Sequence, residues 1–191
     1  MPRRWIILIL FFLLSGFSLI GELAAEQRPS YTRTMENYQV PDVVLTNQDG
    51  VRIKLREFLT YDGPVLVDFV FTTCTTICPV LSSNFMNFQR TVSPESGKAR
   101  LVSISVDPDF DTPKTMKAYM KRYQAKPGWD FLTGSRTDID QVLQAFNVYS
   151  VDKMGHPPVI LLKSPTDKRW VRIYGLIGTK TLLAEYEKVR L

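Results

Sequence analysis

The sequence predicts an α/β domain with a mixed β-sheet that is parallel at its centre and covered by helices on both faces. Three short apolar runs have the continuous hydrophobic character of strands buried on both sides; they are residues 65–71, 100–106 and 158–163. Segments with helical periodicity lie between them, and strands that alternate with helices indicate a parallel core. Two hairpin-like segments, one near each end of the domain, make the sheet mixed.

The first hairpin is expected in "VVLTNQDGVRIKL", where two alternating runs surround Asn47 to Gly50. Asp49 and Gly50 supply the turn chemistry that such a hairpin needs. The second is expected in "SPTDKRWVRIYG", after the last apolar run. Helical periodicity appears in four segments, which are residues 79–90, 113–123, 137–146 and 179–189. Asp111 and Thr112 are placed to cap the second of these helices, with Pro113 at its first position.

Residues 1–25 form a separate export segment. Arg3 and Arg4 precede an almost unbroken apolar run, "WIILILFFLLSGFSLI", and then "GELAA". The run is longer than a typical signal core and shorter than the roughly 20 residues that span a bilayer comfortably, so a signal peptide and a membrane anchor both stay open. We favour the anchor, because Leu23 is larger than the small residue usual at that place before a cleavage site.

The basic start holds the N-terminus in the cytoplasm and sends the rest of the chain across the membrane. The expected location is therefore the exported side, a bacterial periplasm or cell envelope, where disulfides can form and persist. Residues 26–37 are polar and lack periodicity, which predicts a tether. Residues 38–191 are expected to form one domain, which the total length of 191 residues allows. The net charge of +5 is spread along the chain, so no nucleic-acid-binding stripe is predicted.

The only two cysteines, Cys74 and Cys78, follow the first apolar strand and precede a helix. Reactive groups gather at the carboxyl ends of strands in open α/β sheets, and a helix N-terminus stabilises a thiolate. Because the spacing is one helical turn, both sulfurs can lie on one face and either close a disulfide or share a metal. A purely structural disulfide is less favoured, since so short a loop restricts the unfolded chain little.

His156 is the only histidine, and it lies immediately before the strand at residues 158–163. Pro157 and Pro158 follow it. A strand-entry loop with proline beside a two-cysteine turn is the layout of thioredoxin-like folds, and in such a fold His156 comes within reach of Cys74 and Cys78.

Together with this histidine, the segments "FVFTTCTTICP", "ISVDPDFDTPKTMKAYMKRY" and "WDFLTG" resemble the Sco/SenC family. These are membrane-tethered, thioredoxin-like copper-binding proteins implicated in assembling the dinuclear copper site of cytochrome c oxidase. The resemblance extends from about Pro41 to the C-terminus. It implies copper as the cofactor, Cys74, Cys78 and His156 as the metal ligands, and Asp107 as an outer-shell partner or weak ligand.

One segment departs from the family pattern. Lys153, Met154 and Gly155 precede His156, where the family usually has an aspartate directly before the histidine. Pro158 resembles the cis-proline of thioredoxins, which leaves a redox role open.

The donor types agree with copper independently of the resemblance. Two thiolates and an imidazole are soft donors suited to Cu(I), whereas zinc normally takes four protein ligands in a closed structural site. Cu(II) would prefer a fourth ligand, which water, Asp107 or Met154 could supply. Met154 alone is better interpreted as a loop or packing residue.

Three functions remain, in decreasing order of preference. The first is an exported, membrane-tethered copper chaperone that supplies the copper-site subunit of cytochrome c oxidase or another exported cuproprotein. The second is a thiol-disulfide oxidoreductase acting on the cysteines of a copper-site partner and served by a thioredoxin-like reductant, with Cys74 attacking and Cys78 resolving. The third, a peroxidase of the thioredoxin superfamily, gives no reason for the histidine. The first two are linked, because copper needs both thiols reduced.

Overall fold

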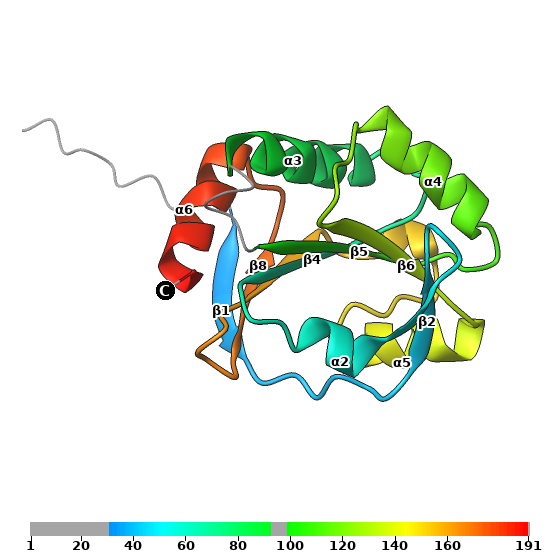
Figure 1. Cartoon of the computed structure of the whole chain (residues 1–191), viewed down its shortest axis with the longest axis horizontal. Coiled ribbons are helices and arrows are strands. Elements are labelled where there is room, and N and C mark those ends of the chain that lie inside the picture. The colour runs from blue at the N-terminus through cyan, green and yellow to red at the C-terminus, as the bar shows by residue number, and fades with distance from the viewer. Residues whose placement is uncertain (1–30, 93–98, 191) are drawn as a thin grey trace, which may run out of the picture.

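A computed structural model describes residues 31–92 and 99–190, which form one eight-stranded sheet with helices on both faces (Figure 1). The elements in chain order are β1 (Thr32–Glu36), β2 (Val44–Asn47), β3 (Arg52–Lys54), α2 (Leu55–Leu59), β4 (Val65–Val70), α3 (Cys78–Thr91), β5 (Arg100–Ser105), α4 (Pro113–Arg122), β6 (Trp129–Thr133), α5 (Arg136–Ala145), the 3-10 turn η1 (Lys153–Gly155), β7 (Val159–Lys163), β8 (Trp170–Tyr174) and α6 (Thr179–Val189).

The sheet is mixed, as predicted, with the strand order β1-β8-β7-β4-β5-β6-β2-β3. Its centre is parallel, since β5 pairs in parallel with both β4 and β6. The other pairs are antiparallel, including the two expected hairpins, β2 with β3 and β7 with β8. All six residues of β4 are buried, which explains why this strand is a continuous apolar run broken only by Asp68.

Helices α3 and α4 cover one face of the sheet and α2 and α5 the other, while α6 lies beside α3 (Figure 1). Aromatic contacts fill both layers: Phe85 of α3 meets Trp129 of β6, and Phe69 of β4 meets Phe146 after α5. Thr112 caps α4 as predicted, because its hydroxyl accepts the backbone N–H of Thr115.

The sheet includes five residues of the segment that was expected to be a polar tether. Strand β1 pairs antiparallel with β8 at the sheet edge, so the folded region begins before the expected boundary at Tyr38. Most of its side chains are exposed, so it carries no apolar alternation that would reveal a strand. Polar contacts hold it instead: Tyr31 and Arg33 both bind the buried carboxylate of Glu185 in α6.

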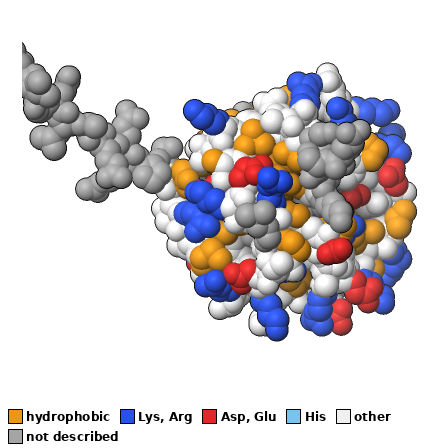
Figure 2. Space-filling view, turned by 60° about the vertical axis from the view of Figure 1, so that its left-hand side comes forward, with side chains coloured by type: hydrophobic (Ala, Val, Ile, Leu, Met, Phe, Trp, Pro, Cys, Tyr) orange, Lys and Arg blue, Asp and Glu red, His pale blue; other side chains and the backbone are white. Residues whose placement is uncertain are grey.

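The predicted signal or anchor segment, residues 1–25, lies outside the described residues. Within residues 31–92 and 99–190, no helix combines the length and apolar character needed to cross a bilayer. On the face of the domain shown in Figure 2, Lys and Arg side chains are interspersed with Asp and Glu side chains.

Candidate metal centre

The two cysteines lie where β4 ends and α3 begins, and both are free thiols. The backbone turns sharply after the strand, with the N–H of Cys74 donating to the carbonyl of Phe71. Cys78 is the first residue of α3, and its N–H donates to Cys74 Sγ at 3.4 Å. Since Ile77 offers no capping side chain, the Cys74 sulfur accepts a hydrogen bond from the helix N-terminus.

The two thiols lie in different environments, which shift their pKa values in opposite directions. Burial alone would raise the pKa of the Cys74 thiol, but hydrogen bonds from Cys78 and Thr76 outweigh it and place this pKa below its ordinary value. Burial raises the pKa of the Cys78 thiol far above its usual range, and the hydrogen bond to Cys74 adds to this effect. Cys74 is therefore the thiol that ionises first, and Cys78 stays protonated while the site is metal-free.

This contrast predicts selective alkylation of the reduced, metal-free chain. At neutral pH, Cys74 is expected to react with iodoacetamide at least about tenfold faster than Cys78, because the thiolate is the nucleophile. Peptide mass spectrometry after short exposures measures the ratio, and the urea-denatured chain, in which the two thiols should react at similar rates, is the control. Faster alkylation of Cys78 in the folded chain would contradict the assignment.

His156 directly follows η1, and its imidazole lies against the cysteines. Its Nε2 is 3.7 Å from Cys78 Sγ, and its ring meets the ring of Phe71 edge-on. The side chain is buried, and Nδ1 has no hydrogen-bond partner within the described structure. Burial lowers the pKa of His156, so the imidazole is largely neutral at pH 7 and keeps a lone pair for a metal or a proton.

The structure thus brings Cys74, Cys78 and His156 together at the start of α3, although they do not form a ready-made metal site. In the part of the chain that the structure describes, no three His, Cys, Asp or Glu side chains already stand close enough to hold an ion. Binding would have to draw the three donors closer together. The side chain of Met154, in contrast, is exposed in the loop.

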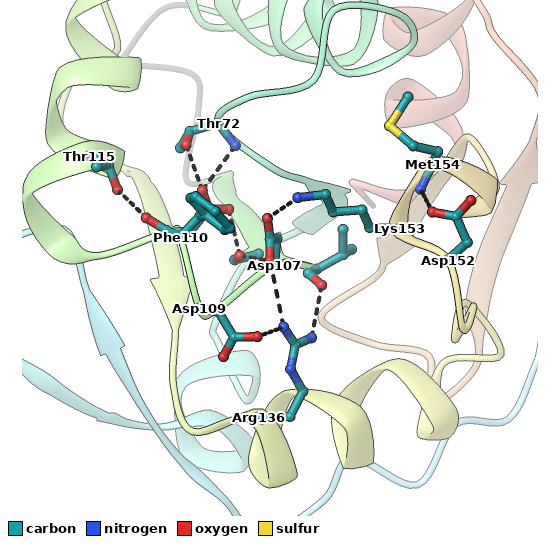
Figure 3. A network of polar contacts seen from close by, with 12 residues as sticks. Thr72, Asp107, Asp109, Phe110, Thr115, Arg136, Asp152, Lys153 and Met154 are labelled. Atoms are coloured by element: carbon teal, nitrogen blue, oxygen red, sulfur yellow. Dashed lines mark hydrogen bonds and ion pairs between the residues drawn. The ribbon is translucent and has the colours of Figure 1, made fainter.

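Asp107 is buried beside this site, and its carboxylate forms ion pairs with two basic side chains (Figure 3). Its Oδ2 lies 2.6 Å from Lys153 Nζ, and its Oδ1 lies 3.6 Å from Arg136 of α5. Lys153 belongs to η1, so Asp107 is connected to the loop that carries His156. Asp107 was predicted from the sequence as an outer-shell partner or weak ligand. Nothing in the sequence predicted that its carboxylate would pair with Lys153.

Asp111 makes a similar connection to the cysteine loop, and its expected role as a helix cap is wrong. Its Oδ1 accepts the backbone N–H and the hydroxyl of Thr72, and its Oδ2 accepts the hydroxyl of Ser105. Thr112 alone caps α4.

Pro158 also differs from expectation, since no peptide bond in the described ranges is cis.

Comparisons with known proteins agree on one family. A family model described as SCO1/SenC matches residues 32–185. The chain is 36% identical over 128 residues to a protein of Bacillus subtilis called "SCO1 protein homolog", and this match covers 65% of each protein. The chain therefore spans less than two thirds of that relative.

Solved structures give the same result. BsSco, described as a member of the Sco family of cytochrome c oxidase assembly proteins with a disulfide switch, is 28% identical with a TM-score of 0.67, covering 83% of this chain and 96% of that one. Bradyrhizobium japonicum ScoI with copper bound is 27% identical with a TM-score of 0.63, covering 76% of this chain and 96% of that one. These matches confirm the predicted thioredoxin-like α/β fold.

Proposed function

The chain belongs to the SCO1/SenC family, and from this premise we propose that it is an exported copper chaperone. It holds copper as cargo through Cys74, Cys78 and His156 and delivers it to the copper-site subunit of cytochrome c oxidase or to another exported cuproprotein. The observation that carries the proposal is the contact of His156 with Cys78 at the start of α3, beside Cys74.

The chemistry of these donors fits copper. Two reduced sulfurs and a neutral imidazole are soft ligands, and Nδ1 of this imidazole has no hydrogen-bond partner among the described residues. Copper would displace the proton of each thiol, so binding depends on pH and on both cysteines being reduced. A donor set that must close around its cargo is also able to reopen, which suits delivery better than permanent storage. The disulfide switch described for BsSco supports the dependence on reduced cysteines, and the copper-bound ScoI of Bradyrhizobium japonicum supports copper as the cargo.

A second candidate, a thiol-disulfide oxidoreductase, is favoured by the unequal acidities of the two thiols. In this reaction the Cys74 thiolate attacks a partner's disulfide and releases one partner thiolate. Cys78, after losing its proton, then attacks Cys74 Sγ, releases the second partner thiol and leaves a Cys74–Cys78 disulfide. The partner gains two electrons and the chain loses two, so a separate dithiol reductant is needed to restore it.

His156→Ala separates the two functions. If the imidazole is a copper ligand, its loss is expected to lower copper affinity by more than about 100-fold, beyond what the loss of an outer-shell partner typically costs. Disulfide exchange by the cysteines should continue. The measurements are copper stoichiometry and affinity of the reduced and oxidised full-length chain, the rate of exchange with a model disulfide, and cytochrome c oxidase activity in cells that lack the native protein.

Met154→Leu is the matched control, because Met154 lies in the same loop with its side chain exposed and should bind copper as the wild type does. Circular dichroism checks that both variants fold. Normal copper binding with slowed exchange in His156→Ala would reject the chaperone and favour the oxidoreductase. Equal copper binding by the reduced and oxidised chain would reject the two-thiol site.

A further inference from the structure

The loop that carries His156 is held to the rest of the protein mainly by one side chain. Within residues 149–155, the side chains of Ser150 and Asp152 form hydrogen bonds to the loop itself. Lys153 makes the one side-chain hydrogen bond or ion pair between this stretch and the remainder of the described structure. A polar pocket of about 340 Å³, open to solvent, lies beside this contact and is lined by Asp107, Arg136 and residues 149–153 of the loop.

The position of Lys153 couples this contact to the site. Its Nζ lies over the ring of Phe71, at 5.3 Å from the centroid, and over the ring of Phe110 at 4.9 Å. Phe71 is the same ring that meets His156 edge-on. The charge of Lys153 therefore lies over the same aromatic ring that contacts the histidine.

The carboxylate of Asp107 is itself held in place by its surroundings, so it can fix the position of Lys153. Its side chain is buried, with a 2.6 Å contact to Lys153, and Arg136 approaches its other oxygen. Its own backbone N–H donates to Ser105 Oγ, and the same hydroxyl donates to Asp111, which binds Thr72 in the cysteine loop. Figure 3 shows Thr72, Asp107, Arg136 and Lys153 within this network of polar contacts. The segment from Asp107 to Asp111 thus contacts both loops of the site.

We propose that the Asp107–Lys153 ion pair is a positioning device that holds the loop of His156 against the cysteines, so that Asp107 acts through Lys153 and is not itself a copper ligand. This inference rests in part on the proposed copper site, but its central claim concerns the metal-free loop.

The charge of Lys153 can be removed while a side chain of similar length is kept over Phe71 and Phe110. Lys153→Met keeps a long apolar side chain over Phe71 and Phe110, and Asp107 keeps Arg136 as a partner, so the variant should fold. Asp107→Asn removes the charge from the other side. Lys153→Arg keeps the charge and should restore much of the effect. Lys117→Met is the control, because Lys117 also pairs with an aspartate, Asp49, outside this loop.

The first measurement is hydrogen exchange of the reduced, metal-free, full-length chain. In Lys153→Met and in Asp107→Asn, the amides of Gly155 and His156 are expected to exchange about tenfold faster than in the wild type, because a charged hydrogen bond that closes the loop is lost. Lys153→Arg and Lys117→Met should stay close to wild type. Unchanged exchange in Lys153→Met would overturn the proposal whether or not the chain binds copper.

The second measurement is a double-mutant cycle on copper affinity. Each single variant is expected to lose about tenfold in affinity, and the double variant no more than either one, because the two residues act as a unit. A much larger loss in Asp107→Asn than in Lys153→Met, with additive effects in the double variant, would make Asp107 a ligand and overturn the proposal. If the wild-type chain binds no copper, the proposed function fails, and the exchange measurement alone decides the role of the ion pair.

Discussion

Cys74→Ser and Cys78→Ser are each expected to lower Cu(I) affinity by more than about 100-fold, a larger effect than the loss of any outer-shell partner. A serine hydroxyl is a hard and weakly acidic donor, so one sulfur and one imidazole would remain for a soft ion. Titration of the reduced full-length variants with Cu(I) against a competing chelator measures the change.

The two cysteine variants should differ in one respect that the structure makes testable. Cys74→Ser removes the sulfur that accepts the N–H of Cys78, but the serine oxygen can accept the same hydrogen bond, so the start of α3 should persist. Cys78→Ser places a hydroxyl at a fully buried position and is expected to cost more in stability. Wild-type copper affinity in either folded variant would exclude a two-thiol site.

The parts of the fold that the sequence predicted are those with a local signal. Strands β4, β5 and β7 are buried apolar runs, and α4 has its Thr112 cap and Pro113. Strand β1 was not predicted because an exposed edge strand has no apolar pattern, and its stability comes from pairing with β8 and from Glu185, far away in the chain. Strand β6 lies in the segment "WDFLTG", for which no strand was predicted from the sequence.

In the candidate site, too, the residues with a local sequence signal were predicted and the contacts between distant residues were not. Cys74, Cys78 and His156 were found because each is rare in this chain and placed next to a strand, and the structure brings them together. Their role as ligands stays a prediction. The network of Asp107, Lys153 and Arg136 could not be predicted, since an ion pair between residues 46 positions apart depends on the tertiary fold. Charged residues are common, so their mere presence carries little information.

Asp68 is the one charged residue inside the apolar run of β4, and no role was predicted for it from the sequence. It lies between Ser103 of β5 and Ile160 of β7, and it is completely buried. Neither carboxylate oxygen has a hydrogen-bond partner among the described residues. Burial therefore raises the pKa of Asp68 to about 7, with the nearby Ser103 opposing this shift without cancelling it. A titratable neighbour is the thiol of Cys78, whose pKa the ionised carboxylate raises further.

A raised carboxyl pKa destabilises the folded state at high pH. Below the unfolded-state pKa of 3.8 both states are protonated and no penalty exists. Between 3.8 and about 7 the unfolded chain releases this proton while the folded chain keeps it, so the free energy of unfolding falls as pH rises. Above this window the penalty is constant, and the shift corresponds to roughly 4 kcal/mol.

Asp68→Asn is expected to remove this pH dependence, because the amide is neutral in both states and nearly isosteric with the protonated acid. The free energy of unfolding of the variant, relative to the wild type, should rise by roughly 4 kcal/mol from acid to mildly alkaline pH. Urea unfolding of the reduced, metal-free, full-length proteins at several pH values measures this difference. Infrared spectroscopy provides a second readout, since a protonated carboxyl band that disappears near pH 7 should be present in the wild type and absent in Asp68→Asn. A constant stability difference across this range would show that the pKa of Asp68 is the same in the folded and unfolded states, and would reject the proposed shift.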